Sequence, residues 1–547
     1  MQRFATSAKD AVTADCVHVQ HTVAVHCACK DKSFPTEPLP LGPIEDLIAP
    51  MIPIAVSFVY RYSGPMEVSS AFVSADLVRQ AMAHVLSFYP PLSGRLVLLP
   101  NGDRKVDRLD SGALFVEATC TASLRELHEA RAGGSEKADA RFRDVLSMFD
   151  LPAGSNALFA SFSPAIHHVV QDPLFTLQHT RFACGSVALG VRISHALTDA
   201  QGFFQVMQHL MELYDQLQRG EARLTLRRPP RWRSYKSTFR AEATPAEVAE
   251  ALAYVPAALY VEEPPVKGTT TAAAVAASPA LPLPLPSPPE VVGRELYFST
   301  DELEELKRRA TPSSNRNGWV STFEALSAFL WQCVYRARCA VCACDSRMAH
   351  DTSTWPVTDY LTSINLRDRF LDPSTGEAAD YFPVGCFAPV TKVRPKVLRD
   401  GPLHELAAAV HAMLRSPELS PNEVQRTVRW IAAQPDRSRI RNRFAAGGFM
   451  LSAWNKFDIY GSTACAGTQP VLVSTPFTCI SLLDVLGYIL PRPPSFADPA
   501  ISPAATDDGD SGKLRSTASD GVVIYLAVDA SLWEALSSRE LLGSHLH

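Results

Sequence analysis

The sequence predicts an α/β protein built from two domains. The chain has 547 residues, of which 46% are hydrophobic and 20% are charged, so it can bury more apolar surface than one ordinary domain holds. Residues 187–194 alternate between large apolar side chains and mostly small ones, which is typical of a β-strand, and residues 203–217 carry apolar side chains at helical spacing. A run rich in proline and alanine over 267–290 then divides the chain into two halves.

The first half begins with two strands and a helix. The first strand is expected over 18–29, and a proline-rich loop leads to a second strand over 54–62. A helix is predicted over 75–86, with Ser74 or Asp76 as its N-cap.

His195 directly follows the strand over 187–194 and keeps the parity of its apolar side chains. Its imidazole is therefore expected to point inward at the end of a strand rather than into bulk water. Because the unperturbed pKa of histidine lies close to neutral pH, a histidine in this place is suited to act as a general base. The alternative is a histidine that is only hydrogen-bonded within the core.

The proline-rich run sets the expected domain boundaries. Residues 1–17 are expected to form a disordered tail, and 18–266 form the N-terminal half. Residues 267–290 contain Pro-Leu-Pro-Leu-Pro, which cannot continue a helix or a sheet, so they are predicted to be an extended crossover linker. Residues 291–547 form the C-terminal half.

The second half starts with a strand over 295–298 and a capped helix over 299–307. Loops are expected over 340–358 and 491–520, of which the second is polar and expected to be disordered. A late strand is predicted over 522–528.

Several segments resemble a known family when they are taken in order. They are His-Ala-Leu-Thr-Asp at 195–199 (HxxxD), LSFYPPLSGRL at 86–96 (FYPLAGRL), VSTFEALSAFLW at 320–331 (a core helix), INLRDR at 364–369 (NxRxR), Tyr381-Phe382 (the start of YFGN), and SAWNKF at 452–457 followed by Tyr460. Together they resemble the BAHD-type acyl-CoA-dependent acyltransferases. The last segment is similar to the SxWxKFxxY segment of the fungal trichothecene 3-O-acetyltransferase branch. The resemblance covers roughly residues 18–530.

This resemblance implies a fold and a reaction. The fold would be the two-domain CoA-dependent acyltransferase fold, in which each half is a mixed β-sheet flanked by helices and a tunnel runs between them. His195 would lie in the tunnel as general base, with acyl-CoA as co-substrate, no permanently bound cofactor and no covalent intermediate. The product would be an ester, or an amide if the acceptor is an amine, of a small secondary metabolite.

Asp199 is expected to be structural rather than catalytic. A carboxylate buried beside a core strand is costly unless a charge with hydrogen bonds matches it. The resemblance implies an arginine partner from the NxRxR segment, with Arg367 preferred and Arg369 as the alternative. Gly202 is expected to let the chain turn tightly into the following helix.

The second motif of the family, DFGWG, is degenerate in this chain. Its place is taken by Thr-Ala-Cys-Ala-Gly at 463–467, where only Gly467 is retained. In the family this loop shapes the donor tunnel, so the resemblance implies that Thr463 and Gly467 lie near coenzyme A together with Trp454 and Lys456. The alternative is a structural loop that has diverged.

Three other motifs point to different chemistry. HHxxxD at 167–172 is the hallmark of peptide-synthetase condensation domains, but here it is expected in a loop with no carrier region beside it. A cluster of Cys339, Cys342 and Cys344 with His350 could hold zinc, but it lacks paired CxxC knuckles, so reduced loop cysteines and no metal are expected. Gly-Asp-Ser-Gly at 509–512 has no matching histidine segment before it, which excludes a serine protease.

The net charge of −5 gives no electrostatic reason to expect a nucleic acid or an anionic membrane as partner. The N-terminus lacks the apolar core of a signal peptide, and the twelve cysteines are spread along the chain, so a monomeric cytoplasmic protein is expected. Two other functions stay open. One is a non-catalytic relative that binds a small molecule, and the other is a condensation-type amide synthase.

Overall fold

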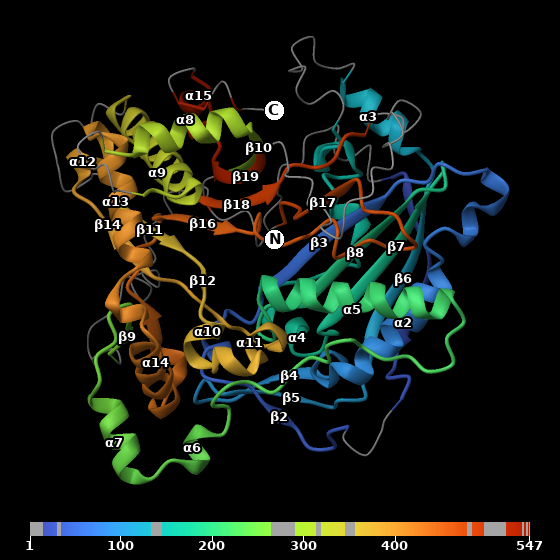
Figure 1. Cartoon of the computed structure of the whole chain (residues 1–547), viewed down its shortest axis with the longest axis horizontal. Coiled ribbons are helices and arrows are strands. Elements are labelled where there is room, and N and C mark those ends of the chain that lie inside the picture. The colour runs from blue at the N-terminus through green and yellow to red at the C-terminus, as the bar shows by residue number, and fades with distance from the viewer. Residues whose placement is uncertain are drawn as a thin grey trace, which may run out of the picture.

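The computed structural model contains two sheets that stand side by side, each with helices against it (Figure 1). The expected linker lies outside the described residues except for residue 290, as does the expected tail except for its last three residues; Val17 already belongs to the first strand. The described residues are 15–29, 34–132, 145–263, 290–312, 319–344, 356–478, 484–496, 521–538, 541, 542 and 545.

The first sheet has six strands, of which five come from the first half of the chain. In spatial order they are β1 (Val17–Val25), β6 (Ala113–Cys120), β7 (Phe175–Phe182), β8 (Val187–Ser194), β3 (Pro53–Tyr60) and β17 (Leu472–Ser474). The β6–β7 pair is parallel and the other pairs are antiparallel, so the sheet is mixed. The short strand β17 comes from the second half and pairs with β3, which ties the two halves of the chain together.

Two helices cover one face of this sheet, α2 (Ala75–Phe88) and α5 (Ala200–Gln218), and they lie in front of it in Figure 1. Because α5 has apolar residues at helical spacing, it buries one side against the sheet, including Phe203, Met207 and Tyr214. The expected strand at 187–194 and the helix after it are therefore present, and His195 lies in the short turn between them.

The second sheet is also mixed. Its spatial order is β10 (Val291–Phe298), β19 (Val522–Asp529), β18 (Leu486–Pro491), β16 (Phe449–Ala453), β11 (Asp359–Thr362) and β14 (Val390–Lys392). The pairs β11–β16 and β16–β18 are parallel. The associated core is packed by α8 (Thr300–Ala310), α9 (Thr322–Cys344), α13 (Leu403–Leu414) and α15 (Leu532–Leu536). The predicted α/β fold with a mixed sheet in each half is confirmed.

Shorter elements surround these two layers. The small sheets are β2 (Leu39–Pro40), β5 (Arg104–Asp107) and β4 (Arg95–Leu98); β9 (Leu259–Val261) with β15 (Ile440–Asn442); and β12 (Ile364–Asn365) with β13 (Cys386–Phe387). The remaining α-helices are α3 (Leu124–Ala132), α4 (Ile166–Val169), α6 (Phe239–Glu242), α7 (Pro245–Ala253), α10 (Arg367–Phe370), α11 (Glu377–Asp380), α12 (Pro395–Asp400) and α14 (Pro421–Ala433).

Some expected boundaries need correction. The first strand ends at Val25 rather than at 29, and α9 continues to Cys344 into the loop expected over 340–358. The added residues, Cys-Ala-Val-Cys-Ala-Cys at 339–344, contain no glycine or proline, so nothing in them ends the helix. Ser74 occupies the N-cap position of α2 without a side-chain hydrogen bond to the helix.

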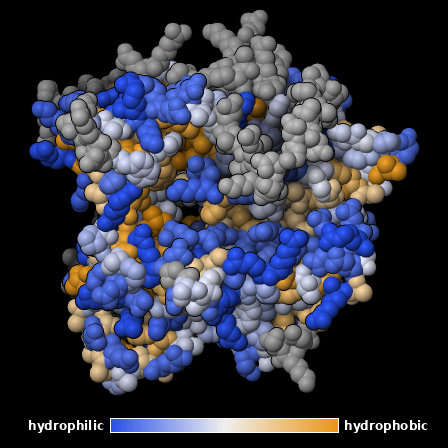
Figure 2. Space-filling model, viewed as in Figure 1, coloured by the Kyte–Doolittle hydropathy of each residue, from blue (hydrophilic) through white to orange (hydrophobic). Residues whose placement is uncertain are grey.

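Hydrophilic side chains cover most of the face shown in Figure 2, and a hollow lies near its middle, bordered in part by hydrophobic side chains. Within the described ranges, the helices are too short or too polar to cross a membrane.

Candidate active site

His195 lies at the end of β8, where the chain leaves the first sheet. Its backbone N–H donates to the carbonyl of Ile52, and its Nδ1 is 2.8 Å from the carbonyl oxygen of Thr198. A carbonyl can only accept, so Nδ1 carries the proton in this bond, and in the neutral imidazole Nε2 then has the lone pair. The imidazole is half-buried, and this tautomer is the one that a general base requires.

A cavity of about 630 Å³ adjoins His195, between the two halves, where the resemblance predicts a tunnel. It is lined from the first half by residues that include Ile52, His195 and Gln201, and from the second half by residues that include Met450 and Tyr488. Neither half encloses this space alone, so the site exists only in the assembled fold.

Asp199 and Arg367 form an ion pair at one wall of this cavity. Nη2 of Arg367 is 2.8 Å from Oδ1 of Asp199, and Nη1 is 2.9 Å from Oδ2, which is the bidentate geometry of a guanidinium with a carboxylate. The side chains are 1% and 7% exposed, so water screens the pair very little.

Backbone groups complete the coordination of this carboxylate. Oδ1 accepts from the N–H of Gly202 at 3.2 Å, which makes Asp199 the N-cap of α5, and Oδ2 accepts from the N–H of Gly385 at 2.8 Å. Burial raises the pKa of Asp199, but Arg367 and these N–H groups outweigh burial, so the pKa lies below its usual value. The aspartate is therefore held as an anion.

Of the two arginines in the NxRxR segment, Arg367 and not Arg369 pairs with Asp199. Arg367 also donates from Nε to the carbonyl of Tyr381 and from Nη2 to the carbonyl of Pro383. Arg369 instead donates to the carbonyl of Leu419, away from Asp199. The guanidinium of Arg367 thus joins α5 to the segment that begins with Tyr381-Phe382.

Gly202 has a different role from the expected tight turn. It lies inside α5, and a Cβ atom there would be 2.0 Å from Oγ1 of Thr198 and 2.2 Å from the carbonyl oxygen of Phe382. Thr198 itself donates to the Phe382 carbonyl over 2.6 Å. Gly202 is therefore required by close packing, because the segment of the second half passes directly against the start of the helix.

The structure brings only part of the expected donor site together. Trp454 and Lys456 line the cavity with His195, Trp454 as a buried wall and Lys456 as an exposed residue. Thr463 and Gly467 are not among the described residues that line it. Thr463 is fully buried and Gly467 is exposed at a φ of +74°.

The loop over 463–467 is bonded to the first half. The hydroxyl of Tyr60 donates to the carbonyl of Thr463 over 2.7 Å, and Oγ1 of Thr463 donates to the carbonyl of Ile459 over 2.6 Å. The N–H of Ala466 donates to Asp215 on α5 over 3.3 Å. These contacts hold the loop against the first sheet without an aspartate at its first position.

Sequence reasoning missed Ser452, Thr198 and Gly385. Ser452 lines the cavity, and its Oγ accepts from Nε1 of Trp454 over 3.1 Å. This bond does not use the hydroxyl hydrogen of Ser452, which can therefore be donated to another acceptor. The signal was present, since Ser452 is the first residue of the segment that resembles SxWxKF and Thr198 lies inside HxxxD. Gly385 could not be found from its own neighbours, because its partner is far away in sequence.

A second buried carboxyl group lies beyond Arg367. Glu45 is 1% exposed and accepts from the hydroxyl of Ser234 over 2.5 Å, and the Tyr381 hydroxyl is 3.3 Å from the same Ser234 oxygen. Burial raises the pKa of Glu45 to about 8, so this group is protonated at neutral pH.

The competing motifs lie elsewhere. His167 and His168 form part of the one-turn helix α4 rather than a loop, and both are exposed. Cys339 and Cys342 lie on α9 rather than in a loop, whereas His350 is outside the described residues. No cluster of three metal-ligating side chains occurs in the described parts of the chain.

Comparison with known proteins identifies the family. The model of the Transferase family matches residues 26–475, which is most of the chain, so the protein belongs to this family, the BAHD-type acyltransferases. Taxadien-5-alpha-ol O-acetyltransferase of Taxus chinensis is 35% identical over 162 residues, which are 29% of this chain and 31% of that protein. (Z)-3-hexen-1-ol acetyltransferase of Arabidopsis thaliana is 28% identical over 302 residues, 55% of each chain. The chain thus spans about half or less of the length of these two relatives.

Solved structures show the same fold. F. graminearum TRI101 complexed with coenzyme A and T-2 mycotoxin has a TM-score of 0.62 at 16% identity, with 94% of this chain and 99% of that chain covered. Vinorine synthase has a TM-score of 0.56 at 16% identity, with 97% and 98% covered.

Proposed function

We propose that the protein transfers an acyl group from acyl-CoA to the hydroxyl group of a small, mainly apolar acceptor. The observation that carries this proposal is the 2.8 Å contact between Nδ1 of His195 and the Thr198 carbonyl, which in the neutral imidazole leaves Nε2 to accept a proton. Membership of the family and the acetyltransferase names of the two relatives support the same reaction.

The reaction needs one base and no intermediate that is covalently bound to the protein. Nε2 of His195 removes the proton of the acceptor hydroxyl while its oxygen forms a bond to the thioester carbonyl carbon. The tetrahedral intermediate collapses by breaking the carbon–sulfur bond, and the imidazolium returns the proton to the departing thiolate of coenzyme A. Holding both substrates in one cavity makes the attack effectively unimolecular.

Ser452 is our candidate for a donor to the oxyanion of that intermediate. Its oxygen already accepts from Trp454, so its hydroxyl hydrogen can be donated to an oxygen in the cavity. Asp199 acts as a positioning residue, because its carboxylate is used by Arg367 and by backbone N–H groups.

The charges around the cavity favour an alcohol over a polyamine. Among the described residues that line it, the charged side chains are Asp199, Arg367 and Lys456, and the first two neutralise each other. A cationic acceptor would find no carboxylate available to pair with it. Much of the wall is apolar, with Phe323, Leu414 and other residues of the second half, which suits a hydrocarbon skeleton.

Lys456 and Trp454 are our candidates on the donor side. Lys456 is exposed and also lines the adjacent groove beside α5, so its ammonium group can reach a phosphate of coenzyme A outside the cavity. Trp454 would form the apolar wall along the pantetheine arm.

Release of free coenzyme A thiol tests the proposal. Acetyl-CoA and a medium-chain acyl-CoA are incubated with a panel of apolar primary and secondary alcohols, and matched amines serve as the comparison. Acyl transfer predicts thiol release that requires the alcohol and yields the ester by mass spectrometry. A condensation-type amide synthase would instead require a carrier protein and an amine, and a non-catalytic binding protein would bind donor or acceptor without releasing thiol.

A further inference from the structure

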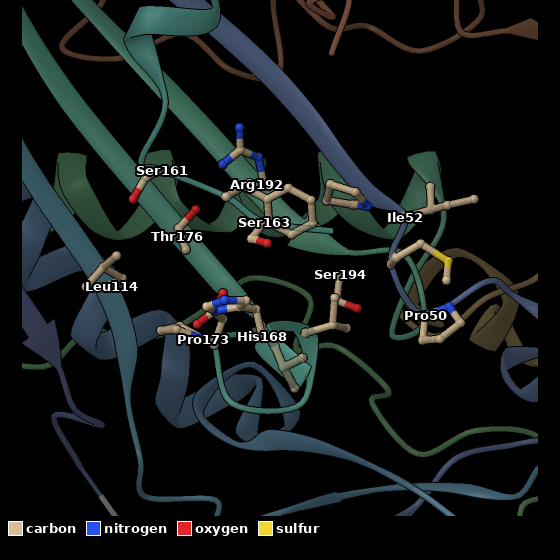
Figure 3. A pocket seen from close by; sticks show the side chains of 16 residues that line it. Pro50, Ile52, Leu114, Ser161, Ser163, His168, Pro173, Thr176, Arg192 and Ser194 are labelled. Carbon is tan, nitrogen blue, oxygen red and sulfur yellow. The ribbon is translucent and has the colours of Figure 1, made fainter. Parts of the chain in front are cut away.

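Two further pockets adjoin the cavity that contains His195. One lies against β7 and β8, shares Ile52 with the cavity, and is shown in Figure 3. The other, of about 750 Å³, is the groove beside α5, and it shares Gln201, Lys456 and Phe457 with the cavity. These three residues are called the junction below. Because Lys456 is our candidate for a phosphate of coenzyme A, the arm of the donor would cross the junction to reach His195.

The charged side chains of the groove pair with each other. Arg228 is 2.9 Å from Asp380, and Arg227 is 3.7 Å from Glu212. At the junction itself, Gln201 and Phe457 are uncharged. An uncharged part of a ligand that crosses the junction must therefore be positioned by packing and by neutral hydrogen bonds.

The amide of Gln201 is oriented by Asn365, which belongs to the second half of the chain. Oδ1 of Asn365 accepts from the backbone N–H of Arg367 over 3.1 Å and from its Nη1 over 3.3 Å. These groups can only donate, so the Asn365 amide nitrogen faces away from them, and it donates to Oε1 of Gln201 over 2.7 Å. The amide nitrogen of Gln201 is left as a donor, and it forms no hydrogen bond with the described residues.

This arrangement extends the ion pair of the HxxxD motif. Nη1 of Arg367 contacts both Asp199 and Asn365, so a continuous chain of hydrogen bonds runs from Asp199 to Gln201. Gln201 is partly exposed, and its unpaired nitrogen is accessible rather than buried. A neutral N–H donor in a fixed orientation suits an oxygen that only accepts, such as the carbonyl of a secondary amide.

We propose that Gln201 binds an amide carbonyl of the pantetheine arm of acyl-CoA at the junction, with Asn365 as the residue that orients it. The pantetheine arm carries secondary amides between the sulfur and the phosphates, so such a carbonyl crosses the junction when the thioester lies at His195. This inference rests on the proposed function, because it takes acyl-CoA as the donor. The bond is present in the ground state and the transition state alike, so it contributes to donor affinity and not to kcat.

Gln201→Met tests the proposal, because methionine has a similar size and no N–H group. Calorimetric titration with coenzyme A gives Kd, and thiol release gives KM for acetyl-CoA. We expect both values to rise about fivefold, the size of one neutral hydrogen bond, while kcat and the KM of the acceptor stay unchanged. Gln218→Met is the matched control, since Gln218 is exposed at the last residue of α5 and is not among the described residues that line the cavity or the groove.

Gln201→Glu separates ligand binding from a role in joining the two halves. Its carboxylate still accepts from Asn365, so a residue that only bridges the halves would tolerate this change. A donor to a carbonyl would not, and we expect Gln201→Glu to weaken coenzyme A at least as much as Gln201→Met does. Acetylpantetheine, which has the amides and no phosphate, should give the same order of KM values among the variants. An effect seen with coenzyme A and absent with acetylpantetheine would contradict the proposal, because it would reflect repulsion of the phosphates.

The remaining outcomes separate this inference from the proposed function. If no alcohol is acylated but Gln201→Met still weakens coenzyme A, acyl transfer is wrong and the assignment of Gln201 holds. If alcohol is acylated and both Gln201 variants keep the wild-type Kd and KM for the donor, the assignment is wrong and acyl transfer stands. A rise in the KM of the acceptor alone would place the bound oxygen on the acceptor and overturn the assignment. A wild type that neither binds coenzyme A nor acylates an alcohol would overturn both.

Discussion

Arg367 contacts both carboxylate oxygens of Asp199, over 2.8 and 2.9 Å, although the two residues lie in different halves of the chain. The aspartate of HxxxD is thereby directed to the guanidinium, and His195 instead takes its orientation from the Thr198 carbonyl. The ion pair therefore joins the start of α5 to the second half at one wall of the cavity.

Asp199→Ala should lower stability as well as activity. It would leave the Arg367 guanidinium buried without its counter-charge, at a cost of roughly 3–5 kcal/mol. Chemical denaturation with urea measures this loss. The double variant Asp199→Leu with Arg367→Met should be clearly less destabilised than Asp199→Ala, because it leaves no buried charge. Equal melting of Asp199→Ala and the parent, with turnover abolished, would require a direct catalytic role for Asp199.

His195→Ala should lower activity without lowering stability. A base contributes to the transition state, so kcat should fall about a hundredfold or more while the melting temperature changes little. Thiol release and circular dichroism on the same preparation measure both effects. Near-normal turnover by a folded variant would remove His195 from the mechanism.

Ser452→Ala should lower kcat by about a hundredfold with little change in KM, because a donor to the oxyanion acts mainly in the transition state. Ser452→Thr retains the hydroxyl and should recover part of the rate. A rise in KM with an unchanged kcat would show that Ser452 binds the ground state and the transition state equally, and would exclude it as the oxyanion donor.

Gly202→Ala should disturb both folding and activity. The added Cβ would lie 2.2 Å from the backbone oxygen of Phe382, so the helix or the neighbouring segment must shift. Exposed Gln208 on the same helix provides the control, since Gln208→Ala should leave the melting temperature within experimental error. An unaltered melting temperature for Gly202→Ala would contradict the packing.

Glu45 should make stability fall as pH rises. Its pKa is about 8 in the folded protein and ordinary in the unfolded chain, so the folded state holds more protons between pH 4.5 and 8. The stabilisation is full below the unfolded pKa and is lost as pH rises through the folded value. Burial also raises the pKa of Asp46, to about 7 despite Arg437, and this acts in the same direction. The melting temperature of Glu45→Gln minus that of the wild type should therefore increase from pH 5 to pH 8, and a constant difference would exclude this titration.

Local patterns predicted much of the fold. The period-2 alternation of 187–194 and the helical spacing after it correspond to β8 and α5, and the capping sequence at Ser299 corresponds to the start of α8 with its Glu302 partner. These elements depend on neighbours a few residues apart, so the chain order contains the information. The end of α9 was missed, because the cysteines over 339–344 were assigned to a loop although this stretch contains no glycine or proline that would end a helix.

The sequence by itself determined which residues could carry the chemistry: a histidine at a strand end, an aspartate that needs a cation, and two arginines that could supply it. Only the tertiary structure decided between Arg367 and Arg369, showed that Gly202 is required by close packing rather than by a turn, and brought Ser452 to the cavity that contains His195. The physical reason is that cavities and bidentate ion pairs depend on segments far apart in the chain. Their distances are set by how the two sheets pack, and no local pattern encodes those distances.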